Sequence, residues 1–361
     1  PASSPIYMEL VKNGVVADLM EAGTVVKTAF CGPCFGAGDT PAHGQLAVRH
    51  TTRNFPNREG SKPGNGQLAS VALMDARSIA ATAANGGRIT AADELGYEYE
   101  CPEYVYDPIA YEQRVYQGFK KEDPDEELVC GPNIKDWPEL PELNDHMLLK
   151  VCAYITDPVT TTDELIPSGE TGSFRSNPMG LAEFTLSRRV PEYVGKAKVV
   201  MNYEKERKNG GCPKEVQKIL EKIHSIHGYE KIDDQTIDLS STIYAVKPGD
   251  GSAREQAASC QKVLGGWANI ANEYATKRYR SNLINWGMIP FIIDEGDLPF
   301  QNLDYLFVPG IREAIASGKT EFEAYVVKDG QMKPFTLKMG ELTPDEKDII
   351  LKGCLINYYR G

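Results

Sequence analysis

The sequence has no excess of basic residues. Its 39 lysines and arginines are outnumbered by 51 aspartates and glutamates, which gives a formal net charge of −12 at pH 7. General nucleic-acid-binding proteins are usually basic, so this acidic charge balance argues against that class. It still permits a local basic pocket for an acidic substrate.

Long apolar runs are also missing. No segment has the roughly 20 consecutive apolar residues that a membrane-spanning helix needs, and the amino terminus has no signal-peptide pattern. The eight cysteines are scattered, unlike those of a small disulfide-rich domain. We therefore expect a cytoplasmic protein with mostly reduced thiols, long enough at 361 residues for two domains.

The hydrophobic pattern predicts an α/β protein. Residues 5–22 have helical spacing that ends at Gly23, and residues 67–85 form an Ala-rich run that predicts a second helix. Residues 24–30 predict a buried strand, and residues 45–50 predict another. The region after a Tyr- and Pro-rich connector predicts a mixed second unit, with strands near 147–156, 237–246, 263–271 and 288–293 and helices near 214–227 and 343–359.

Cys31 and Cys34 lie in a Cys-Gly-Pro-Cys turn. This spacing occurs in thioredoxin-type redox pairs, in zinc sites and in iron–sulfur sites. The Gly-rich stretch that follows is poor helix material, which weighs against a redox pair at a helix start. Neither a second cysteine pair nor the five histidines complete a zinc site. Partial ligation of an iron–sulfur cluster remains, although two thiolates alone cannot hold one.

Arg53 and Arg58 follow in the turn TTRNFPNREG. An arbitrary arginine in such a turn is usually a solvated surface residue. A guanidinium group, however, binds a carboxylate through two parallel hydrogen bonds. Two such groups on one turn could hold a polycarboxylate.

The segment GDGSARE contains Ser252, Arg254 and Glu255. Ser252 and Glu255 have the spacing of a capping box at a helix start. Backbone N–H groups and the positive end of the helix dipole gather at such a start. They could stabilise Ser252 as an alkoxide base, and Arg254 could hold a carboxylate.

A third set consists of Thr161-Thr162-Asp163 and of Phe174-Arg175. The first part is typical of an ordinary helix N-cap, and it would not stand out on its own.

Taken together, these motifs resemble the aconitase family of iron–sulfur hydro-lyases. CGPCFG resembles its cluster loop, TTRNFPNREG its arginine turn and GDGSAREQAA its catalytic-serine loop. VTTTDELIPSG resembles the start of its swivelling last domain, and YATKRYRSNLINWGMIPF resembles the strand and turn that follow the serine loop. Their order and approximate separation also match over most of the chain.

The resemblance implies a role for each of these residues. Cys31 and Cys34 would be two of three thiolates that hold a 4Fe–4S cluster. Ser252 would be the catalytic base, and Asp163 would belong to the active-site network. The substrate's carboxylates would be bound by four arginines, Arg53, Arg58, Arg175 and Arg254.

The resemblance also implies a partial protein. The family's third cluster cysteine and its proton-donating Asp–His pairs precede the region that this chain resembles, and the first residue is Pro1. We do not expect Cys101 or Cys130 to replace that cysteine. Glu164, Thr52 and Ala253 depart from the family's usual residues and suggest an outlying branch.

We therefore expect the C-terminal half of an aconitase-like hydratase. Residues 1–94 would be the end of a three-layer α/β third domain, residues 95–145 a linker, and residues 146–361 a mixed β/β/α swivel domain. The missing domains would be supplied in cis or by a partner chain, and the chain alone would be inactive. The substrate would be a hydroxy-polycarboxylic acid. Two alternatives remain, a thiol–disulfide oxidoreductase that uses Cys31 and Cys34 and a cluster-free RNA-binding relative.

Overall fold

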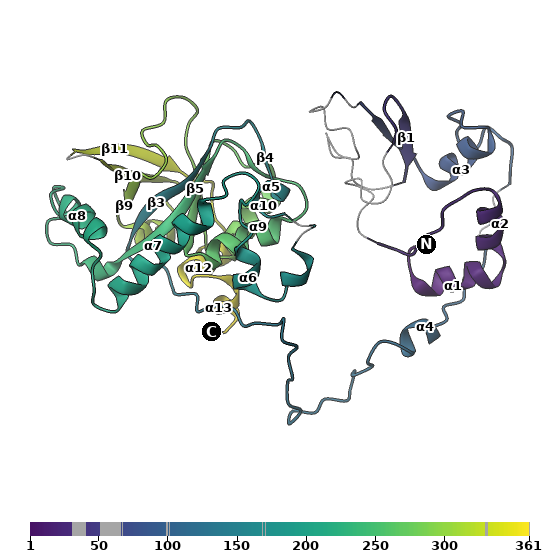
Figure 1. Ribbon diagram of the computed structural model, residues 1–361, viewed down its shortest axis with the longest axis horizontal. Helices are drawn as coiled ribbons and strands as arrows, with labels where there is room; N and C mark the ends of the chain where they lie inside the picture. The colour runs from purple at the N-terminus through teal and green to yellow at the C-terminus, as the bar shows by residue number, and fades with distance from the viewer. Residues whose placement is uncertain are drawn as a thin grey trace. The chain divides into compact units, whose positions relative to one another are not determined.

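A computed structural model describes residues 1–30, 41–50, 66, 68–98, 100, 102–167, 169, 171–328 and 331–360. It divides into two compact units, Pro1–Glu127 and Leu128–Gly361 (Figure 1). Both units contain helices and strands, which confirms the predicted α/β class. No helix in the described ranges is long and apolar enough to cross a membrane.

The first unit begins with two helices where the sequence predicted one. Helix α1 covers Ser4–Lys12 and is capped by the Ser3 hydroxyl, which accepts from the Ile6 amide. Helix α2 covers Val15–Glu21 and follows Gly14, whose φ of 84° is readily adopted only by glycine. This left-handed residue separates the two helices, although the apolar spacing of the sequence continues across it.

The next predicted helix, over residues 67–85, is only half correct. Its first part is strand β2 (Ser70–Leu73), which pairs in parallel with β1 (Leu46–Arg49), the strand predicted over residues 45–50. Helix α3 starts only at Ala76 and runs to Ala84, because the Asp75 carboxylate caps it by accepting from two backbone amides.

The strand predicted over residues 24–30 is wrong. These residues have no strand structure, and Val25 and Phe30 are 74% and 47% exposed. A short apolar segment is stable as a strand only when it pairs, and no strand of the described ranges pairs with it.

The second unit is built around a closed barrel with the strand order β10-β11-β8-β7-β5-β3-β9 (Figure 1). Neighbours β3, β5, β7 and β8 run parallel, whereas β9, β10 and β11 join by antiparallel pairs. The strands are β3 (His146–Ile155), β5 (Ile237–Ala245), β7 (Gly266–Ala271), β8 (Ile289–Ile292), β9 (Tyr305–Val308), β10 (Glu321–Lys328) and β11 (Gln331–Lys338).

Strand β3 lies between two hydrophobic cores. Successive strand residues point to opposite faces, so Leu148 packs into one core while Met147 and Leu149 pack into the other. Both faces are buried, which explains why the strand is apolar almost throughout rather than at every second position.

Helices cover the outside of this barrel. The predicted helix at 343–359 is two helices, separated near Gly353 with its φ of 87°. The Thr343 hydroxyl and the Glu346 side chain cap the first of them reciprocally.

In the connector, the helix that the structure describes is α4 (Ile109–Glu112). The helices of the second unit are α5 (Thr162–Leu165), α6 (Pro178–Ala182), α7 (Tyr193–Lys208), α8 (Lys214–Ile223), α9 (Arg254–Val263), α10 (Lys277–Asn285), α11 (Ile311–Ser317), α12 (Pro344–Leu351) and α13 (Leu355–Arg360).

Candidate active site

Two motifs far apart in the sequence meet beyond the carboxyl ends of β3 and β5. Each strand is followed by a short extension, β4 (Thr160–Thr161) after β3 and β6 (Pro248–Asp250) after β5. The extensions pair in parallel, with Thr161 opposite Asp250. Figure 1 shows β4, α5, α9 and α10 gathered in this part of the second unit. Ligand sites of α/β sheets usually lie at such strand ends.

The serine loop between β6 and α9 requires its glycines. Gly249 and Gly251 have φ values of 97° and 132°. A Cβ atom at position 249 would lie 2.3 Å from the Tyr279 side chain, which is buried. The Tyr279 hydroxyl accepts hydrogen bonds from Gln261 and Asn269, and burial raises its pKa. The buried Tyr279 ring therefore restricts the loop to a conformation in which Ser252 is exposed.

The capping box predicted from Ser252 and Glu255 is wrong. The N-cap residue of α9 is Ala253, and no side chain caps the helix. The Glu255 carboxylate instead accepts from the Trp286 indole N–H at 2.5 Å and from the Asn282 amide at 2.8 Å. These donors on and just after α10 occupy both carboxylate oxygens, and they tie α9 to α10 behind the serine loop.

Ser252 lies just before the amino terminus of α9, a helix of ten residues. Backbone N–H groups without intrahelical partners and the positive end of the helix dipole are found there. Arg254, the first residue of the helix, is half-buried. The hydroxyl and the guanidinium group thus belong to residues two apart at the start of α9, an arrangement that can hold an anion and withdraw a proton beside it.

Asp163 lies on α5, which contacts both β6 and α9. The predicted N-cap at its start is confirmed. The Thr161 hydroxyl accepts from the Glu164 amide, and the Glu164 carboxylate accepts from the Thr161 amide. Asp163 is therefore held at a fixed helix start, and its carboxylate accepts from the Arg188 guanidinium at 2.6 Å.

Arg188 is a residue of this region that the sequence did not single out. It lies in a loop between α6 and α7, 25 residues from Asp163. The neighbouring Arg189 pairs with Asp157, in the turn after β3. Neither arginine has a motif around it, so only the folded chain identifies them.

Arg175 is exposed, and the described contacts do not bring it to the serine loop. It directly follows a 3₁₀ helix (Gly172–Phe174), where the Phe174 ring packs against Phe184 at a centroid distance of 5.1 Å. Its guanidinium makes no ion pair within the described ranges, so it is available for an external anion.

Four predicted site residues, Cys31, Cys34, Arg53 and Arg58, lie outside the described residues. In the part of the chain that is described, no group of three His, Cys, Asp or Glu side chains could hold a metal ion. Cys152, Cys260 and Cys354 are buried in the core, and Cys130 and Cys212 are exposed. Burial raises the pKa of Cys152 and Cys260 to about 12, which disfavours the thiolates that metals require.

Two family models match the chain. Residues 1–81 match the aconitase family (aconitate hydratase), and residues 199–296 match the aconitase C-terminal domain. The second match includes β5, the serine loop, α9 and α10.

Curated relatives match a shorter part. The 3-isopropylmalate dehydratase large subunit of Aquifex aeolicus is 36% identical over 96 residues, which are 26% of this chain and 22% of that protein. The same subunit of Caldanaerobacter subterraneus is 41% identical over 81 residues, 22% of this chain and 19% of that protein. The chain thus spans about a fifth of the length of the curated relatives it matches.

A solved structure titled 3-isopropylmalate dehydratase, from Methanocaldococcus jannaschii, aligns with 59% of this chain and 94% of its own. Its sequence identity is 20% and its TM-score is 0.36. The assignment comes from the two family models, which match separate segments in the order expected for one family. Two separate segments of the chain are therefore similar to the aconitase family and to its C-terminal domain.

Proposed function

We propose that the chain is the C-terminal part of a hydro-lyase that adds and removes water on a hydroxy-polycarboxylic acid. The observation that carries this proposal is the pairing of β4 with β6, which brings the helix of Asp163 beside the loop of Ser252 and Arg254. The family models that match on both sides of the connector support it.

In this proposal Ser252 removes the proton from the carbon next to the one that bears the hydroxyl group. A serine hydroxyl is a weak base, and its alkoxide needs nearby positive charge. The amino end of α9 and the Arg254 guanidinium provide that charge within one loop. Asp163, paired with Arg188, holds the adjoining helix in position.

The substrate's carboxylates would be bound by arginines. Arg254 is close in sequence to the base, and Arg175 is exposed on the same unit. The family resemblance implies the same role for Arg53 and Arg58, which lie outside the described residues. Relatives named 3-isopropylmalate dehydratase favour a malate that carries an apolar substituent as the substrate.

The described cysteines do not fit an iron–sulfur cluster, since they are dispersed in the core or on the surface. Cys31 and Cys34 have suitable donor chemistry and would hold a 4Fe–4S cluster together with a thiolate from outside the chain. When bound, such a cluster supplies a Lewis-acidic iron for the substrate's hydroxyl group.

The domain boundaries follow the same proposal. Residues 1–94 would be the C-terminal part of the family's third domain, residues 95–145 would be the linker, and residues 146–361 would be the swivel domain. The preceding domains would be joined in cis or supplied by a partner chain, as the large-subunit names of the relatives suggest.

The test combines this chain with a polypeptide that carries the preceding domains, after anaerobic reconstitution with iron and sulfide. Hydration and dehydration of 3-isopropylmalate and citrate are followed by the ultraviolet absorbance of the unsaturated acid. We expect activity in the mixture and none in the chain alone. Ser252→Ala should abolish it, whereas Ser281→Ala, at an exposed serine on α10, should not. A mixture that stays active with Ser252→Ala would refute the assigned base.

A further inference from the structure

A cavity lies at the opposite end of α9 from Ser252. It has a volume of about 440 Å³, within the range of small-molecule sites. The ends of α7 and α9, the beginnings of β5 and β7 and a segment of the connector enclose it. Its apolar walls include Leu140, Met201, Leu239, Val263 and Trp267.

Lys262 is the unusual residue of this cavity. It lies in the last turn of α9 and is only 4% exposed. Its Nζ atom makes no hydrogen bond with any described residue, and it lies 3.2 Å from the centroid of the Trp267 ring. A buried polar group without a hydrogen bond is costly. Burial lowers the pKa of this amine to about 7, so its charge is only partly retained at neutral pH.

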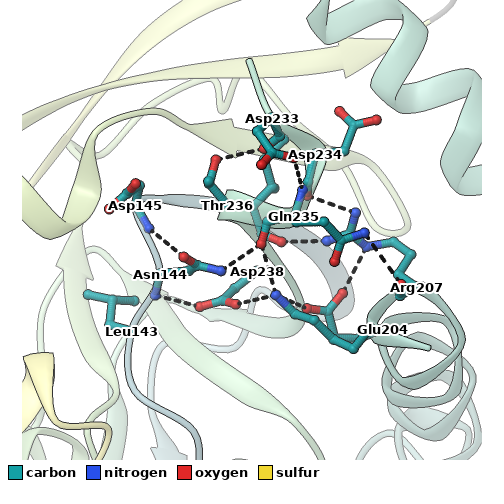
Figure 2. Close-up of polar contacts among 12 residues, drawn as sticks. Leu143, Asn144, Asp145, Glu204, Arg207, Asp233, Asp234, Gln235, Thr236 and Asp238 are labelled. Carbon is teal, nitrogen blue, oxygen red and sulfur yellow. Dashed lines mark hydrogen bonds and ion pairs between the residues drawn. The ribbon is translucent and has the colours of Figure 1, made fainter. Parts of the chain in front are cut away.

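Charged side chains in and beside the cavity wall lie close to groups of opposite charge. The Arg207 Nε atom lies 2.9 Å from Glu204, and the Lys208 Nζ atom lies 3.6 Å from both Glu204 and Asp238. Figure 2 shows Arg207 and the carboxylates of Glu204 and Asp238 in this network. Burial raises the pKa of both carboxyl groups.

The remaining ionisable groups around Lys262 give it no direct partner in the described structure. Asp238 and Cys354 act on its Nζ atom only through longer-range electrostatics. Lys205 and Glu139, at the exposed rim, have opposite signs. Among the three lysines of the described cavity wall, Lys262 is the buried one, and no described carboxylate is hydrogen-bonded to it.

The walls are held in place before any ligand binds. The buried Arg207 side chain donates to the backbone carbonyl groups of Asp234 and Ile237, which fastens the end of α7 to the beginning of β5. The Asn144 backbone amide donates to the Asp238 carboxylate at 2.8 Å, which fastens the connector to the same strand (Figure 2). A preformed site of this kind loses little free energy in becoming ordered when it binds.

We propose that this cavity binds a monocarboxylate with an apolar chain. The carboxylate pairs with the Lys262 ammonium group, and the chain packs against Leu239, Val263 and Trp267. The site is separate from the serine loop, because the ten residues of α9 place about 15 Å between the two ends of that helix.

Calorimetric titration of the full 361-residue chain at pH 7 tests this, with octanoate and octanamide as probes. The two differ mainly in charge, so we expect octanamide to bind about tenfold more weakly or worse. Octanoate binding should take up protons, measured by comparing buffers of different ionisation enthalpy, because pairing restores the charge of Lys262. Equal affinity for the two probes, or no saturable binding of octanoate, would overturn the proposal.

Lys262→Met supplies the matched variant, since it keeps an unbranched apolar side chain and removes the amine. It should bind octanoate about as weakly as octanamide, whereas Lys218→Met, at an exposed lysine on α8 away from the cavity, should bind octanoate like the unaltered chain. Unchanged octanoate affinity in Lys262→Met contradicts the assignment. The comparison of the two probes on the unaltered chain does not depend on how that variant folds.

Discussion

The Tyr279 ring occupies the space that a side chain at position 249 would need, with a ring carbon 2.3 Å from the Cβ position. Gly249 also has a φ of 97°. Gly249→Ala should therefore combine backbone strain with overpacking and lower the free energy of unfolding by about 3 kcal/mol or more. Urea unfolding monitored by circular dichroism measures this.

Gly228→Ala separates the two contributions. Gly228 has a similar φ of 93°, but no atom lies within 4 Å of its Cβ position. This variant should show the backbone strain alone, about 1–2 kcal/mol. If the two variants lose equal stability, the contact with Tyr279 does not shape the serine loop.

Local patterns in the sequence predicted the elements that depend on few partners. The N-cap at Thr161 follows from residues within one helical turn, and the strand at 147–156 follows from an apolar run. Predictions failed where distant residues decide the outcome. Glu255 could have capped its own helix, but it binds Trp286, 31 residues away.

The candidate site divides in the same way. A glycine-rich loop with a serine and an arginine is visible in the sequence, because those residues are contiguous. Arg188 could not be predicted, because its importance depends on a partner 25 residues away. Lys262 was missed because a lysine in a helix is ordinarily exposed, and only the closed barrel and the connector bury it.

The ion pair between Asp163 and Arg188 should matter for activity and not for stability. Both side chains are about a third exposed or more, and such pairs contribute at most about 1 kcal/mol. We expect Asp163→Asn to unfold at nearly the same urea concentration as the unaltered chain. In the reconstituted enzyme it should lower kcat/KM about tenfold or more, because the helix beside the serine loop loses an anchor. The control is Asp294→Asn, which breaks the exposed pair with Lys338. Equal losses of activity in both variants would show that Asp163 has no special role.

Cysteine reactivity should follow burial. Cys152 and Cys260 are fully buried and their pKa values are raised to about 12, and Cys354 is buried in the same core. Thiolates react with iodoacetamide, whereas buried thiols do not. Peptide mapping by mass spectrometry should find Cys130 and Cys212 alkylated in the native chain, and the three buried cysteines only after unfolding in urea. Rapid native alkylation of Cys260 would mean that the packing between α9 and the barrel opens readily.

Stability should rise with pH above neutrality because of Lys262. Burial lowers the pKa of its amine to about 7 in the folded chain, whereas a solvated lysine has a pKa of 10.5. Between these values the unfolded chain binds more protons than the folded chain, so raising the pH favours folding, by up to about 1.4 kcal/mol per pH unit. Below pH 7 the amine is protonated in both states, and this contribution to the slope vanishes. Urea unfolding from pH 7 to pH 9.5 should show the rise relative to Lys262→Met, while Lys205→Met, at the exposed rim, should keep it. If Lys262→Met and the unaltered chain show the same dependence of the free energy of unfolding on pH, the buried amine keeps its proton, through a partner that the cavity supplies.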